Sequence, residues 1–111
     1  MNGMTALILN LIHFKIMKTK ELIWKLESTV YLLDEIVLNY RSEDWNMLKA
    51  RIADHIGVTK GSVNMAIGNL KWILSDGSEG LSAYTVRQEE AVRLTLEKYE
   101  LSKQKLLMIL S

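Results

Sequence analysis

Two helical patterns of apolar residues meet at one glycine, Gly57, and this junction constrains the fold more than any other feature of the chain. Glycine can adopt the left-handed backbone that ends a helix, and Thr59 can cap the helix that follows. The apolar positions recur at the three- and four-residue steps of one helical face, at Trp45, Leu48, Ile52, Ala53 and Ile56 before the glycine and at Val63, Ala66, Ile67 and Leu70 after it. We therefore predict a helix-turn-helix over residues 44–74.

Ala53 strengthens this prediction, because a small residue at that point lets the two helices cross closely. An ordinary helical hairpin would accept larger side chains at both Ala53 and Gly57. A helix-turn-helix can also serve as an oligomerisation or partner-binding module, so the motif alone does not assign a function.

The composition favours helices over sheets. The 111 residues contain no proline and only six glycines, and a chain of this length builds one core. We expect an all-α single domain, residues 1–111, of about four to five helices. The absence of cysteine excludes disulfides, zinc-thiolate sites and thiol catalysis, and makes the cytoplasm the expected location.

Further elements are expected on both sides of the helix-turn-helix. An amphipathic pattern from Thr19 to Tyr40 predicts a long preceding helix, and either Ser42 or Asp44 can cap the helix that follows. The segment 75–85, "SDGSEGLSAYT", is a loop, either a rudimentary wing or a plain connector. Thr85 and Gln88 form a capping box for a C-terminal helix over residues 86–110.

The N-terminal segment, residues 1–18, is apolar but does not resemble a membrane span. Its apolar run is short and is interrupted by Asn10, His13 and Lys15, and it lacks a basic leader. We expect no membrane association. The segment is either an extension before a second translation start at Met17 or an amphipathic helix that packs on the domain or on a partner chain.

The outward face of the predicted helix after Thr59 carries small and polar side chains that suit contact with DNA. Asn64 can pair bidentately with adenine, Lys60 can reach guanine or a phosphate, and Gly61 permits close approach. The net charge of +1 is low, but a small basic surplus falls on residues 41–74. The predicted DNA-binding residues are Lys49, Arg51, Thr59, Lys60, Gly61, Ser62, Asn64, Met65, Asn69 and Lys71, with Gly68 on the same face.

Enzymatic chemistry is not indicated. The two histidines, His13 and His55, lie on different predicted helices, and the acidic pairs are neighbours on helices rather than facing carboxylates. The segment 75–80 lacks the lysine and the strand-to-helix context of a phosphate-binding loop. We expect no catalytic residue, no metal site and no cofactor.

The string "RIADHIGVTKGSVNMAIGNLKWI", followed by "GLSAYT" and "VRQEEAV", resembles the N-terminal helix-turn-helix module of HNH-type restriction endonucleases, in which the related segments have the form "GRTPGSVSMKLGNF" and "GLSNAS". The likeness covers residues 31–99. It implies that this module engages DNA through Thr59, Lys60, Ser62, Asn64 and Asn69. The chain departs from that pattern at Val58 and Lys60, where the family has arginine and proline, and it carries no nuclease.

These observations favour a small DNA-binding regulator of a mobile element or phage. The alternative is a protein-interaction module, such as a phage-type inhibitor of a host nuclease or defence enzyme, which would bind a host protein. The apolar C-terminal run, with Leu106, Leu107, Ile109 and Leu110, would be a liability if exposed on a monomer. We therefore expect a homodimer that buries this end and places two recognition helices on double-stranded DNA.

Overall fold

Residues 24–111 are described in the computed structural model, and they contain helices and connections without any strand. The helices are α3 (Leu26–Asn39), α4 (Trp45–Ile56), α5 (Lys60–Leu74), α6 (Val86–Lys98) and α7 (Lys103–Leu110). The prediction of an all-α single domain is confirmed. The expectations for residues 1–18, and for the start of the preceding helix at Thr19, lie outside the described residues.

Side chains that accept backbone hydrogen bonds define where four of these helices begin. Asp44 accepts from the Met47 N–H at 3.1 Å, so Asp44 rather than Ser42 caps α4. The predicted capping box is present at α6, where the Thr85 hydroxyl accepts from the Gln88 N–H and the Gln88 side chain accepts from the Thr85 N–H. Short polar residues thus place the starts of α4, α5 and α6 where the sequence suggests.

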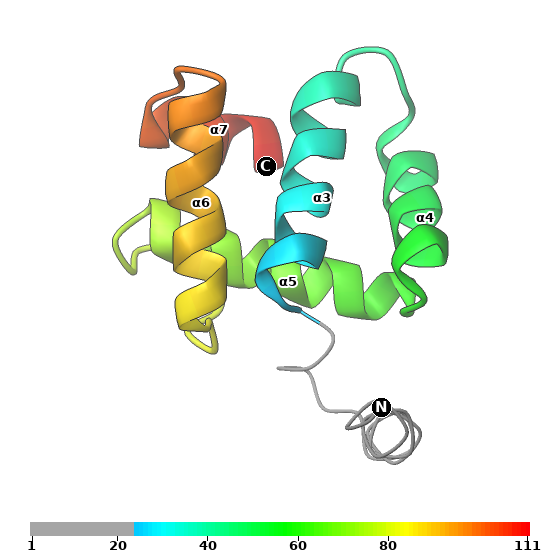
Figure 1. Ribbon diagram of the computed structural model, residues 1–111, viewed down its shortest axis with the longest axis horizontal. Coiled ribbons are helices and arrows are strands. Elements are labelled where there is room, and N and C mark those ends of the chain that lie inside the picture. The colour runs from blue at the N-terminus through cyan, green and yellow to red at the C-terminus, as the bar shows by residue number, and fades with distance from the viewer. Residues whose placement is uncertain (1–23) are drawn as a thin grey trace, which may run out of the picture.

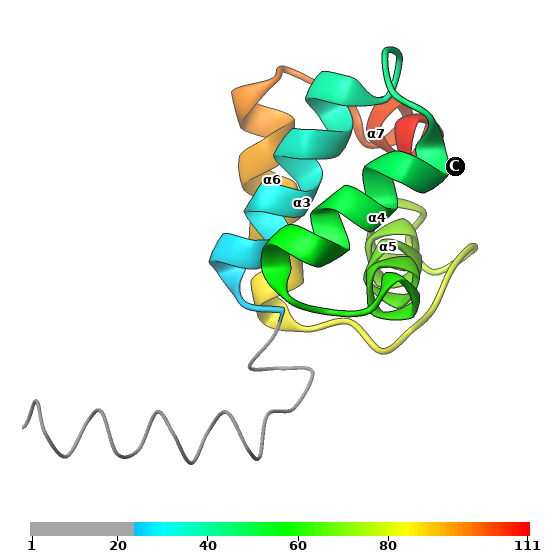
Figure 2. The ribbon, with the colours of Figure 1, turned by 90° about the vertical axis from the view of Figure 1, so that its right-hand side faces the viewer.

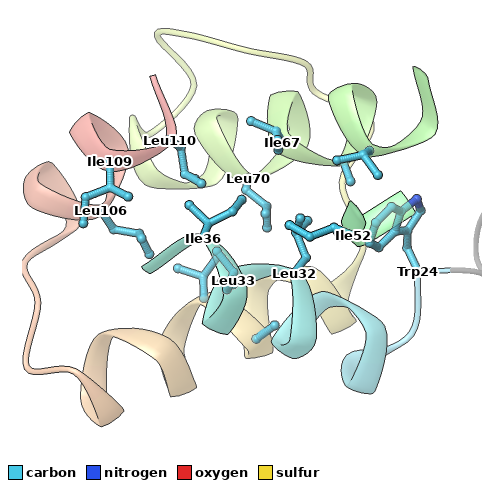
Figure 3. Packing of buried hydrophobic residues seen from close by; sticks show 14 of the residues in the cluster. Trp24, Leu32, Leu33, Ile36, Ile52, Ile67, Leu70, Leu106, Ile109 and Leu110 are labelled. Atoms are coloured by element: carbon cyan, nitrogen blue, oxygen red, sulfur yellow. The ribbon is translucent and has the colours of Figure 1, made fainter. Parts of the chain in front are cut away.

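The helices form two layers around one core. In Figure 1, α3 stands between α6 and α4, and α5 crosses beneath them, with α7 packed near the other end of α3. Figure 2 shows the same arrangement from the side, with α4 and α5 forming the two arms of the helix-turn-helix. The core residues come from all five described helices, and those that meet in the centre include Leu32, Leu33, Ile36, Ile52, Leu70, Leu106 and Leu110 (Figure 3). The helix-turn-helix therefore packs against three other helices, α3, α6 and α7.

The predicted single C-terminal helix is wrong, because the chain breaks into α6 and α7. Glu100 adopts a left-handed conformation with φ of 52°, and Ser102 then caps α7 by accepting from the Lys105 N–H. This turn reverses the chain and brings α7 back onto α3 and α5. A continuous helix would have carried its apolar end away from the domain.

The apolar C-terminal run is consequently buried within the domain itself. Leu106, Ile109 and Leu110 are 0%, 7% and 2% exposed, and Leu107 is half-buried. The argument that this run needs a second subunit to cover it is therefore wrong, and the homodimer itself stays a prediction. No helix within residues 24–111 is both long enough and apolar enough to cross a membrane.

Candidate nucleic-acid interface

The turn between α4 and α5 has the geometry of a helix-turn-helix. Gly57 ends α4 with φ of 86°, and both its N–H and that of Val58 donate to the Ala53 carbonyl. Thr59 then starts α5 by accepting from the Ser62 N–H at 3.0 Å. Ala53 is 5% exposed at the helix crossing. The predicted roles of Ala53, Gly57 and Thr59 are thus all found in the structure.

The first half of α5 is open to solvent. Lys60, Gly61, Asn64 and Met65 are exposed, and Met65 retains 40% of its surface. A Cβ atom on Gly61 would contact only the Thr59 hydroxyl, at 3.7 Å, so the absence of a side chain at Gly61 leaves open space beside the helix. Because residues four apart lie on one helical face, Lys60 and Asn64 are neighbours there. The structure therefore brings four of the predicted contact residues together.

Lys49 joins this group from α4. Its ammonium donates to Asn64 Oδ1 at 2.8 Å and lies 5.3 Å from the centroid of the Trp45 ring. Trp45 was expected only as a core anchor, but it is half-buried and also positions this lysine. The four-residue spacing of Trp45 and Lys49 on one helix was the sequence signal for this contact.

None of the three lysines of the helix-turn-helix is neutralised by an ion pair within the described residues. The ion pairs within residues 24–111 use Arg51, Arg87, Arg93, Lys98 and Lys103. In this described part of the chain, Lys49, Lys60 and Lys71 make no ion pair with a carboxylate. Their charge is therefore available to an external anion.

Arg51 is held by ion pairs within the domain, unlike the three lysines, and its predicted contact with DNA stays a prediction. Its guanidinium pairs with Glu35 at 2.7 Å and, through two nitrogens, with Glu43 at 2.9 and 3.0 Å. The hydrogen bond from Arg51 lowers the pKa of Glu43, and the bonds to Glu43 and Glu35 raise the pKa of Arg51. These ion pairs connect α4 to α3 and to the turn before α4, so Arg51 is a structural residue.

Two further predicted contact residues have other surroundings than expected: Ser62 is hydrogen-bonded within the domain, and Asn69 is buried. Ser62 Oγ accepts a hydrogen bond from the Trp24 indole N–H at 3.0 Å. Asn69 is only 6% exposed, and its Oδ1 has no hydrogen-bond partner among the described residues. Burial of Asn69 contradicts its predicted contact with DNA, whereas the Ser62 hydroxyl accepts from Trp24 and keeps its own O–H as a donor.

The loop 75–85 covers the second half of the outward face of α5. It contains no strand, so it is a connector and not a β-ribbon, and it passes beside α5 (Figure 2). The Leu81 N–H donates to the Gly68 carbonyl at 2.9 Å, and the Leu81 side chain lies over Gly68. Lys71 is half-buried beside this loop. Only the first half of the predicted face is open.

The described histidine is part of the packing. His55 stacks on Tyr31 with ring centroids 4.2 Å apart. Within residues 24–111 no three His, Asp or Glu side chains come close enough together to hold a metal ion. His13 lies outside the described residues.

No match to the chain was found among protein families, curated proteins or solved structures. The resemblance to the endonuclease module therefore stays a prediction. The functional argument depends on the geometry of α4 and α5.

Proposed function

We propose that the protein binds double-stranded DNA by placing the first half of α5 in the major groove. The observation that carries this proposal is the group of Lys49, Lys60 and Asn64 on an open helix start, where neither lysine is neutralised by a carboxylate of the described chain. In helix-turn-helix proteins the N-terminal residues of the second helix contact the base edges. The loop over Gly68 leaves that part of α5 free.

The start of α5 adds a favourable field to these side chains. The first N–H groups of a helix lack intrahelical partners, and the helix dipole places partial positive charge there. A DNA phosphate near Lys60 would meet both the ammonium and this end of the helix. Lys49 would add a contact to the DNA backbone.

A salt titration with a random-sequence duplex tests this proposal. Wild-type protein should bind at about 50 mM salt, with the logarithm of affinity falling linearly as the logarithm of salt concentration rises. Lys60→Met should weaken binding to all duplexes and reduce this slope by about 1. Lys105→Met removes the same charge from α7 and is the matched control.

Two outcomes would contradict DNA binding. The first is an absence of binding to any duplex at low salt by folded protein. The second is an identical change in slope for Lys60→Met and Lys105→Met, which would mean that the contacts are diffuse and do not involve α5.

A protein partner on the same face is the second candidate, and exposed apolar side chains favour it. Met65 is 40% exposed on α5, and Leu81 is 45% exposed on the adjoining loop. Met side chains adapt to varied partner surfaces. In that case Met65→Glu would abolish binding to the partner, whereas Lys60→Met would have little effect.

A further inference from the structure

Asn64 lies at the centre of the candidate interface, and its amide can present two different edges to a base. A bidentate pair with adenine needs Oδ1 and Nδ2 side by side, because adenine offers N7 as an acceptor and N6 as a donor. Guanine offers two acceptors, N7 and O6. Which edge Asn64 presents therefore determines which base it favours.

The contact with Lys49 determines the orientation of this amide. An ammonium group can only donate, so the atom that faces it at 2.8 Å is the acceptor, Oδ1. Nδ2 is the other branch of the amide, and Asn64 is exposed, so its N–H groups can face an external ligand. Asn64 thus directs its acceptor toward α4 and leaves its two donors free.

Lys49 is itself held in place for this contact. Its ammonium lies 5.3 Å from the Trp45 ring centroid while it donates to Asn64, and the Lys49 side chain is half-buried. The attraction of a cation to the face of an indole ring adds to the hydrogen bond. Lys49 uses one N–H group on Asn64 and keeps two, and it takes up one of the two lone pairs of Oδ1, so the pair presents more donors than acceptors to a ligand.

Building on the proposed function, we infer that Lys49 orients Asn64 so that the site recognises the acceptor edge of guanine instead of adenine. Asn64 is the contacting residue and Lys49 the positioning residue. This reverses the preference for adenine that the asparagine suggests when its type alone is considered. Without Lys49 the amide can rotate and present Oδ1 and Nδ2 together.

Selection from a randomised duplex pool tests the inference with five proteins: wild type, Asn64→Ala, Lys49→Met, Lys49→Arg and Lys105→Met. One base position should lose its preference in Asn64→Ala. At this position wild type should favour guanine over adenine by about tenfold. Lys49→Met should lower that ratio by about tenfold, and Lys49→Arg, which also donates, should retain it. Lys105→Met should match wild type.

The outcomes separate this inference from the proposed function. A wild-type preference for adenine at the Asn64-dependent position overturns the inference, and so does a guanine preference that survives in Lys49→Met. Binding of duplex in the salt titration without selection of any Asn64-dependent base also overturns it, while DNA binding stands. Absence of any duplex binding by wild type overturns both.

Discussion

Gly80 lies so close to Gly68 that a Cβ atom on Gly80 would overlap the Gly68 carbonyl oxygen and stand 2.8 Å from the Trp72 backbone nitrogen. The same carbonyl accepts the Leu81 N–H at 2.9 Å. A Cβ atom on Gly68 would in turn lie 2.8 Å from Leu81 Cδ1. The absence of side chains at Gly68 and Gly80 therefore lets the loop 75–85 pack against α5. The loop in turn covers part of that helix.

Gly80→Ala should lower the free energy of unfolding by about 2 kcal/mol or more, because it adds both a backbone clash and strain at a φ of 90°. Gly57→Ala is the matched control, since Gly57 has a φ of 86° but nothing within 4 Å of an added Cβ. Gly57→Ala should lower the free energy of unfolding by only about 1 kcal/mol. Urea denaturation measures both, and equal losses would show that Gly80 does not hold the loop against α5.

Arg51→Met should destabilise the protein at neutral pH more than in acid. The hydrogen bond from Arg51 lowers the pKa of Glu43, so the stabilisation is present above the ordinary carboxyl pKa and is lost as pH falls through the lowered one. The difference in urea midpoint between wild type and variant should therefore shrink from pH 7 to about pH 2.5.

Arg87→Met is the control for this prediction, because Arg87 makes a single, longer ion pair with Glu90 at 3.7 Å on a more exposed surface. It should change the midpoint little at either pH. Arg51→Met should also leave the salt slope of DNA binding unchanged. If Arg51→Met reduced the salt slope of DNA binding as much as Lys60→Met does, Arg51 would be shown to contact DNA.

Asn69→Leu should raise the free energy of unfolding by about 1 kcal/mol. Asn69 is buried, its Oδ1 has no partner among the described residues, and replacing an unsatisfied polar group by an apolar one of similar size removes a desolvation cost. Thermal and urea denaturation provide the measurement. A clear loss of stability would indicate that Asn69 makes a hydrogen bond through water, and a loss of duplex affinity in the folded variant would contradict its burial.

Leu106→Ala should lower the free energy of unfolding by about 3 kcal/mol, because Leu106 is fully buried between α7 and the rest of the core. Met108→Ala, on the same helix but 61% exposed, should change it little. The loss for Leu106→Ala should not depend on protein concentration. A concentration-dependent loss would instead show that α7 packs between subunits.

The sequence alone determined the parts of this protein that depend on local interactions. The caps at Thr59 and Thr85 and the left-handed end of α4 at Gly57 follow from hydrogen bonds and backbone sterics within a few residues, while the sequence left Ser42 and Asp44 as alternative caps of α4. The apolar spacing then identified which sides of α4 and α5 face each other. Such features need no knowledge of distant neighbours.

Tertiary structure decided what each polar side chain is free to do. Arg51 is bound by Glu35 and Glu43, Asn69 is buried, and Lys49 meets Asn64 from another helix. The periodic pattern gives the direction of a side chain from its own helix, but its partners come from segments brought together by folding. The reversal at Glu100, which returns α7 to the core, likewise became stable only because α3 and α5 offered an apolar surface to cover.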